Sequence, residues 1–414
     1  MGLLEARKIS LRAFLFAFYK KEQKMFCMKT AIFTLFAILG FAAFCTAENI
    51  TPEINAENAL CFKIFENCEN KGGENFVLYP KGVCEILKIS LLSSSGEAQA
   101  EFEKILGVKK SELIENLKSG KFASENSEEF CEANLFLASN NFKKNENFSD
   151  ILKKYFGAEV MACDFSQAQK TVDIVNAWTR ENTRSMISEA FAPSDISSLT
   201  SLIIANVAVF DAKWRTKFKN TFKRKFKTPK GFVDVDMMYV HSDEKYAEVE
   251  DFKAVKLSYD GGRHFFVAVL PLDKNSMAFP SAEQFASLWN SFKDVEIRLY
   301  LPKFAFGMKN FDLTKTLKNL GADRAFKFDE ENFSEFFDVK IPQRVDKFFQ
   351  KTFIKVDEEG TKASSVTLVM NAPFSAPPEI KTFRANRPFS FFITDKNGKI
   401  IFMGRVGNPA KMSL

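Results

Sequence analysis

The feature that most constrains the fold lies near the carboxyl end, between Val356 and Phe383, where a strand-like stretch runs directly into a proline-rich one. In the strand-like half, positions 361, 363, 365 and 367 carry Thr, Ala, Ser and Thr, and Lys362 falls between the first two. Successive side chains of a β-strand point to opposite faces, so one face here would be uniformly small and the other solvated. The spacing therefore predicts a strand whose small face can be buried.

The second half of the same stretch favours an exposed, extended backbone. Pro373, Pro377 and Pro378 have no N–H to donate to a sheet, and they favour the extended polyproline conformation. Gly360 stands just before the small-residue run and can act as a hinge, because glycine adopts almost any φ at little cost. One segment can thus serve both as an exposed loop and as a strand.

Residues 1–47 are expected to be a leader outside the folded domain. Within them, residues 28–47 combine Lys29, an apolar run and a small-residue end at Ala47, which is typical of a secretory signal peptide. The run is short for a membrane-spanning helix. We therefore expect export to the extracellular space or periplasm. An uncleaved leader that holds the chain at a membrane, or lipid attachment at Cys45, is the alternative.

Without this leader the chain is nearly neutral. The leader holds seven Lys and Arg and two acidic residues, so the net charge falls from +6 to +1. No overall field would then attract nucleic acid, and no nucleic-acid partner is expected. One local basic run, residues 213–230, contains nine Lys and Arg and no acid. It fits either a polyanion-binding surface or an edge strand protected by lysines, and the second interpretation is favoured.

Few residues could carry catalysis. The only histidines are His241 and His264, and the sequence contains no GxSxG, P-loop, GxGxxG after a strand, or HExxH motif. His264 lies in a strand-like apolar run and is expected to be structural. Beyond the leader, five cysteines without metal-ligand spacing are expected to be buried thiols: Cys61, Cys68, Cys84, Cys131 and Cys163. We expect no enzymatic activity, no cofactor and no metal.

The distribution of periodicities predicts one α+β domain over residues 48–414. Helical spacing dominates the first part, and strand patterns dominate from Ser201, beginning with the apolar run SLIIANVAVFDAKW, which is typical of a strand buried on both faces. No Pro/Gly/Ser-rich linker divides the chain, and no repeat of 20–50 residues is present.

Five blocks spread over about Asn58 to Pro409 resemble the serpin family. They are NVAVFDAKWRTKF, DVDMMY, LYLPKF, FIKVDEEGTKASS and RPFSFFITDKNGKIIFMGRVGNP. The resemblance implies a single serpin-type domain with three β-sheets, eight or nine helices and an exposed reactive loop at about 358–380. It also implies a monomer that inhibits a serine protease as a suicide substrate. The protease cleaves the loop, and the cleaved loop enters the central sheet while a covalent acyl complex still holds the protease.

The family's usual spacing places the reactive bond at Phe374–Ser375. The inserting segment would then be the 14 residues Thr361–Phe374, roughly 46 Å of extended chain. An aromatic side chain before the cut suits a protease with a hydrophobic specificity pocket, so the resemblance and Phe374 together predict a chymotrypsin-like target. Met370–Asn371 is a weaker alternative bond, because cleavage there shortens the inserted strand.

The hinge before the loop resembles that of inhibitory members at Glu358, Glu359, Gly360, Thr361 and Ala363. A charge on the buried face of the inserting strand would oppose entry. The alternative is a non-inhibitory serpin-like binding or chaperone module, whose loop is cleaved without trapping a protease.

The region expected to open for insertion departs from the family pattern. Asn206 and Trp214 are retained, but Gln350 stands where the family has a histidine. Tyr79-Pro80-Lys81-Gly82 replaces the usual Ser-Pro-x-Ser. The segment SELIENLKSGKF carries no dense basic face, so activation by glycosaminoglycans is not expected.

Overall fold

The computed structural model describes residues 49–68, 74–119, 129–141, 143–189, 191–337, 342–360 and 380–411, without the side chains of 308–311. All described residues belong to one compact unit, Asn49–Leu414. The expected leader, residues 1–47, lies outside the described residues. Within the described ranges, no helix is both long and apolar enough to cross a membrane.

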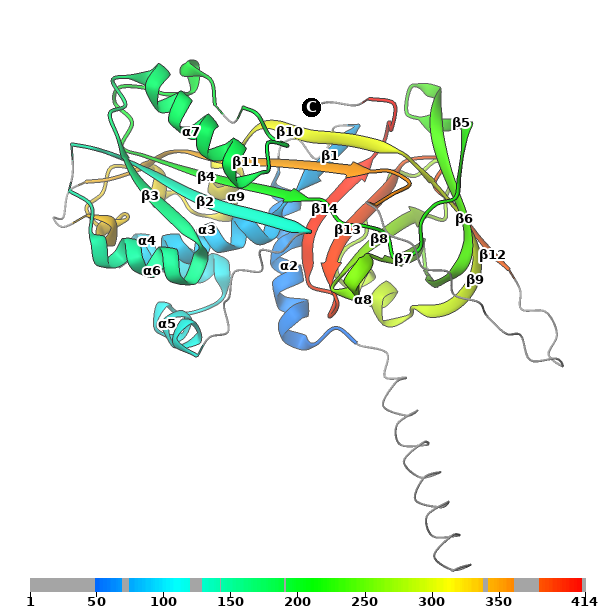
Figure 1. Ribbon diagram of the computed structural model, residues 1–414. Helices are drawn as coiled ribbons and strands as arrows, with labels where there is room; N and C mark the ends of the chain where they lie inside the picture. Colours follow the sequence, from blue (N-terminus) through cyan, green and yellow to red (C-terminus); the bar gives the residue numbers. More distant parts are fainter. Residues whose placement is uncertain are drawn as a thin grey trace, which may run out of the picture. The chain divides into compact units, whose positions relative to one another are not determined.

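The described residues form eight α-helices and fourteen strands (Figure 1). The helices are α2 (Pro52–Asn67), α3 (Pro80–Ser93), α4 (Gly96–Leu106), α5 (Lys110–Lys118), α6 (Glu146–Phe156), α7 (Ala168–Asn182), α8 (Ala282–Asn290) and α9 (Thr314–Leu320). The strands are β1 (Asn75–Leu78), β2 (Phe130–Ser139), β3 (Ala158–Cys163), β4 (Leu202–Phe210), β5 (Asn220–Thr228), β6 (Gly231–Val249), β7 (Phe252–Ser258), β8 (His264–Pro271), β9 (Lys293–Pro302), β10 (Phe304–Asp312), β11 (Val345–Val356), β12 (Lys381–Arg384), β13 (Phe389–Asp395) and β14 (Ile400–Val406).

A five-stranded sheet in the order β10-β11-β4-β2-β3 forms one half of the domain. In Figure 1, α7 lies on one side of this sheet, and α3 lies on the other, backed by α4. All nine residues of β4 are buried. Ile203 and Val207 pack toward α7, whereas Leu202 and Ile204 pack toward α2 and α3. The prediction of a strand buried on both faces is confirmed.

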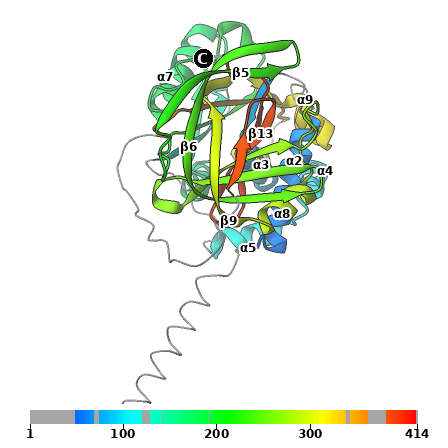
Figure 2. The ribbon, with the colours of Figure 1, turned by 90° about the vertical axis from the view of Figure 1, so that its right-hand side faces the viewer.

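The second sheet has nine strands, in the order β1-β14-β13-β8-β7-β6-β9-β12, with β5 paired to β6. The 19-residue β6 joins two parts of it. Its first residues pair with β5 and its middle with β9, which runs beside it in Figure 2. Its last five residues pair with β7. Of the three expected sheets, the second and third are therefore continuous through one long strand.

Helix ends lie where the turn chemistry predicts them. α4 ends at Gly107 and α9 at Gly321, both with left-handed φ values (67° and 105°) that favour glycine. α6 begins at Asn145, whose side chain accepts a hydrogen bond from the Phe148 N–H. These local signals explain why the helical segments could be recognised from sequence.

Each of the two histidines lies beside a glutamate. His264 is buried, and its Nδ1 lies 3.0 Å from Oε2 of Glu129. His241 pairs with Glu296 at 2.9 Å on the surface of β6 and β9. The five cysteines carry free thiols: three are buried (Cys61, Cys68 and Cys163) and two half-buried (Cys84 and Cys131).

Candidate functional site

The centre of the five-stranded sheet contains a buried hydrogen-bonded cluster between β11 and β4. These strands pair in parallel, and the register places Gln350 opposite Asn206. Gln350 Nε2 donates to Oδ1 of Asn206 at 3.1 Å and to the carbonyl of Tyr79 at 2.7 Å. Its Oε1 accepts from the Tyr79 N–H at 3.0 Å. Gln350 thus links β11 both to β4 and to the start of α3, and the structure brings together two residues predicted to control sheet opening.

The cluster continues across the sheet to α3. Asn206 Nδ2 donates to Oδ1 of Asn134 on β2 at 2.8 Å, and Asn134 Nδ2 donates to Glu85 on α3 at 3.3 Å. Gly82 of α3 packs closely against Asn206: a Cβ at residue 82 would lie 2.5 Å from the Asn206 side-chain oxygen. Buried amides are costly unless paired. The chain of hydrogen bonds therefore stabilises the closed β4–β11 pair.

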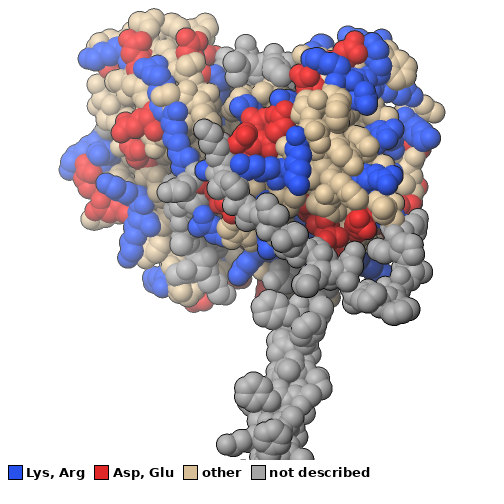
Figure 3. Space-filling model, turned by 45° about the vertical axis from the view of Figure 1, so that its right-hand side comes forward, with Lys and Arg blue, Asp and Glu red and all other residues tan. Residues whose placement is uncertain are grey.

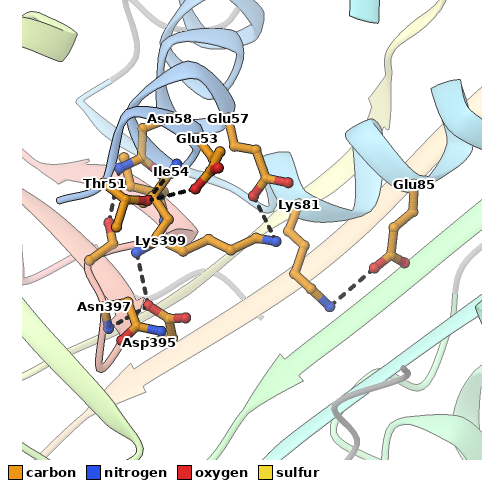
Figure 4. Close-up of polar contacts among 12 residues, drawn as sticks. Thr51, Glu53, Ile54, Glu57, Asn58, Lys81, Glu85, Asp395, Asn397 and Lys399 are labelled. Atoms are coloured by element: carbon orange, nitrogen blue, oxygen red, sulfur yellow. Dashed lines mark hydrogen bonds and ion pairs between the residues drawn. The ribbon is translucent and has the colours of Figure 1, made fainter. Parts of the chain in front are cut away.

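Lys81 forms a charged centre that the sequence reasoning did not find. Its Nζ lies 2.8 Å from Oε1 of Glu132 on β2 and 3.1 Å from Oε1 of Glu85, and the Lys81–Glu85 contact is visible in Figure 4. The side chains of Lys81 and Glu132 are only 9% and 4% exposed. The Tyr79 hydroxyl donates to the Glu132 carboxylate. The replacement of Ser-Pro-x-Ser noted in the sequence thus accompanies a buried ion pair between α3 and β2.

A second ion pair lies near Lys81. Glu57 of α2 contacts Lys399, in the turn between β13 and β14, at 2.7 Å (Figure 4). Burial acts to raise the pKa of Glu57, but the charge and hydrogen bond of Lys399, with Lys88 and Lys81 nearby, hold this pKa below its usual value. This ion pair therefore joins α2 to the second sheet, and the charges of Lys88 and Lys81 on α3 act on it at longer range.

At the end of β11, Gly360 packs directly on Trp214. Gly360 has a φ of +33°, and a Cβ added there would lie 2.3 Å from the Trp214 backbone nitrogen and 2.6 Å from its ring. Only glycine satisfies both the left-handed φ and this close approach. The Trp214 indole N–H donates to the carbonyl of Asp357 at 2.8 Å, and its ring stacks on Tyr259 with centroids 4.6 Å apart. Trp214 therefore fixes the path of the chain as it leaves the sheet.

Glu358 anchors the same turn by charge. Its carboxylate accepts a hydrogen bond from the Thr221 hydroxyl and forms an ion pair with Lys303. Partial burial acts to raise the pKa of Glu358, but these two partners lower it below its usual value. Glu359 differs, because its side chain is 52% exposed and lies 3.7 Å from Lys217. Of the two acidic hinge residues, Glu358 is the one held by close contacts.

We expect Glu358→Gln to loosen this turn. The charge-assisted contacts contribute about 1 kcal/mol after allowance for solvent screening of the partly exposed side chains, which corresponds to about a fivefold increase in local opening. Hydrogen exchange of residues 357–360 measures the change. Glu359→Gln is the matched control and should alter exchange by less than about twofold. Equal exchange in the parent and in Glu358→Gln would contradict the assignment.

The same anchor predicts a pH dependence. A carboxylate whose pKa is lowered in the folded state stabilises that state above its ordinary pKa of 4.5, and this contribution is lost as the pH falls through the lowered value. Local opening at residues 357–360, corrected for the intrinsic exchange rate, should therefore rise below about pH 4.5 in the parent. In Glu358→Gln the corrected local opening of these residues should not change with pH over the same range.

The remaining predicted site residues lie outside the described residues. They are Thr361, Ala363, Pro373, Phe374, Ser375, Pro377 and Pro378. The chain leaves the first sheet after Val356, is described as far as Gly360, and is described again from Ile380, just before β12 pairs in parallel with β9 in the second sheet. The loop segment is thus bounded on one side by the Trp214 turn and on the other by β12.

Comparison with known proteins identifies the class. The family model described as Serpin (serine protease inhibitor) matches residues 55–409, and the chain belongs to this family. It is 29% identical to antitrypsin of Bombyx mori, over 91% of this chain and 99% of that protein. It is also 29% identical to antichymotrypsin-2 of Bombyx mori, over 82% of this chain and 93% of that protein. The crystal structure of the thermophilic serpin tengpin in the native state superposes with a TM-score of 0.76 and 27% identity, covering 87% of this chain and 95% of that one.

Proposed function

We propose that this chain is an exported, monomeric inhibitor of a chymotrypsin-like serine protease and acts as a suicide substrate. The protease serine attacks the Phe374 carbonyl, the bond to Ser375 breaks, and Ser375 leaves as a new amino terminus. The protease then remains joined to Phe374 through an ester. Insertion of residues 361–374 into the five-stranded sheet carries the acylated protease away before water can release it.

The strand directions of the five-stranded sheet carry this proposal. β10 and β11 are antiparallel, β4 and β2 are antiparallel, and β11 and β4 between them are parallel. One added strand between β11 and β4 can therefore be antiparallel to both neighbours. Such a strand converts the parallel contact into two antiparallel ones, which are slightly more stable per residue.

Chain length and connection agree with this arrangement. β11 has 12 residues and ends at Val356, and the proposed inserting segment, 361–374, has 14. The four residues between them would form the turn that reverses the chain, within the usual length of hairpin loops. The small side chains at 361, 363, 365 and 367 would then occupy the buried face of the new strand.

The choice of protease rests on Phe374. The two Bombyx mori relatives are equally identical to this chain, yet one is named for trypsin and the other for chymotrypsin. An aromatic side chain at the cleaved bond fits a hydrophobic specificity pocket and not one with a carboxylate at its base. The chymotrypsin class is therefore favoured.

Mixing with chymotrypsin tests the proposal. We expect an adduct that survives denaturation and a released fragment whose mass begins at Ser375. Phe374→Ala should reduce adduct formation at least tenfold, because it empties the specificity pocket. Complete cleavage at Phe374 without an adduct would contradict inhibition and support the binding or chaperone module. Cleavage at Met370 would place the reactive bond there.

A further inference from the structure

A basic cavity lies at the edge of the second sheet, in a part of the molecule that loop insertion does not use. It encloses about 470 Å³ between β5 and β12. The N–H of Lys227 on β5 donates to the carbonyl of Asn386, just after β12, at 2.9 Å, and the N–H of Ala385 donates to Tyr300 at 2.9 Å. These bonds hold the two walls together. The cavity is lined by Arg224, Lys225, Met237, Tyr300, Arg384 and Asn386.

The floor is apolar and aromatic, and the rim is cationic. Met237 is buried and Tyr300 half-buried, whereas Arg224 and Arg384 are exposed. The Arg384 guanidinium lies 4.7 Å from the centre of the Tyr300 ring, so its plane is held on an aromatic surface. Lys225 is paired with Asp234 at 2.8 Å. In the part of the chain that the structure describes, neither arginine forms an ion pair, so both can bind carboxylates of another molecule.

The basic run noted in the sequence extends this surface. Half of it forms β5, and Lys and Arg gather at the upper right of Figure 3, where Figure 1 places this strand. Phe222 is 42% exposed and lies under the Arg224 guanidinium at 5.4 Å. Exposed Phe and Arg side chains beside a cavity are typical of protein interfaces more than of an edge strand that only avoids aggregation.

The short sequence distance between the proposed reactive bond and β12 indicates which partner reaches this surface. Ser375 and Lys381, where β12 begins, are six positions apart, and the chain between them spans at most about 20 Å. A protease domain of about 240 residues has a radius of gyration of about 18 Å and is therefore roughly 45 Å across. A protease holding the Phe374–Ser375 bond is wider than this span and can therefore reach β12 and the neighbouring cavity.

We propose that the cavity and β5 form an exosite that binds acidic surface loops of the target protease, so that the inhibitor selects a negatively charged enzyme among those that accept Phe374. This inference rests on the proposed function and names the partner surface that the cavity recognises. Arg224 and Arg384 would contact carboxylates on the protease rim. Such contacts increase the rate of encounter more than the strength of the final covalent complex.

The double variant Arg224→Glu/Arg384→Glu tests the exosite. The probes are an anionic and a cationic chymotrypsin-like protease that both cleave after Phe. With the anionic enzyme, the association rate constant should fall about tenfold at about 50 mM salt, and the parent's rate should fall with added salt while the variant's does not. The number of inhibitor molecules consumed per protease should stay unchanged. With the cationic enzyme the rate should not fall.

Lys118→Glu/Lys153→Glu, on α5 and α6, is the matched control because it makes the same change in net charge at exposed sites. It should leave both rates within about twofold, the size expected for screened distant charges. Equal rates for the two double variants would overturn the exosite. A second result would also overturn the exosite. If Arg224→Glu/Arg384→Glu no longer binds dextran sulfate but associates with the anionic protease at the parent's rate, the cavity is a polyanion site. If Arg224→Glu/Arg384→Glu unfolds early on heating, Arg224→Gln/Arg384→Gln replaces it.

The experiments distinguish failure of the exosite proposal from failure of the proposed inhibition. If the parent forms no adduct, the proposed inhibition is wrong, but kcat/KM for cleavage at Phe374 still reports docking. A tenfold lower kcat/KM with the anionic enzyme in the charge-reversal variant would support the exosite. An unchanged value would overturn it.

Discussion

Thr361→Arg is expected to convert the protein from an inhibitor into a substrate of the same protease. Residue 361 is the first on the small face of the proposed inserting strand. A guanidinium there would be buried without a partner, which costs several kcal/mol. Insertion would slow while hydrolysis of the acyl intermediate continues, and the number of inhibitor molecules consumed per trapped protease should rise at least tenfold.

Ser364→Arg is the control for this experiment. In the proposed strand, residue 364 would lie on the face opposite to residue 361, three positions along, so the same guanidinium would face solvent. We expect Ser364→Arg to trap the protease with no more than about a twofold loss, the usual scale of a tolerated surface substitution. If Thr361→Arg traps as well as the parent, the account of the buried face is wrong.

The second large effect is on stability. In the proposed mechanism, cleavage at Phe374–Ser375 frees one end of the loop, and 14 residues would then join β11 and β4 as an added antiparallel strand. A net gain of about 0.5 kcal/mol for each ordered residue is at the low end for hydrogen bonds in proteins. The sum should raise the melting temperature by roughly 10 °C or more. Cleavage of an ordinary exposed loop has the opposite effect, because it removes a covalent connection and adds nothing to the sheet.

The regular elements were predictable because their signals are local. The continuous apolar run of β4 and the glycine stops of α4 and α9 can be recognised in short windows of sequence. The family resemblance placed Gln350 and Asn206 in the same region of the sheet but did not predict their hydrogen bond, since the two residues are 144 positions apart and Gln350 replaces the family's histidine. No periodicity connects a strand of one part of the chain with a strand of another.

Residues that meet across elements were harder to predict. Lys81 and Glu85 are one helical turn apart and could have been paired from sequence, but Glu132 approaches from β2 across the sheet. The basic run can be recognised in the sequence, where its pattern favours a protected edge strand. Its neighbours in the cavity, Tyr300 and Arg384, come from β9 and β12. The continuity of the second and third sheets also depends on the unusual length of β6.

Comparison of thermal unfolding before and after cleavage tests whether the cleaved loop enters the five-stranded sheet. The parent is cleaved at Phe374–Ser375, freed of protease, and melted beside the intact protein, with cleaved Thr361→Arg as the variant whose strand should not enter the sheet. The account predicts that the cleaved parent melts roughly 10 °C or more above the intact protein, and that cleaved Thr361→Arg does not. A cleaved parent that melts at or below the temperature of the intact protein would contradict it.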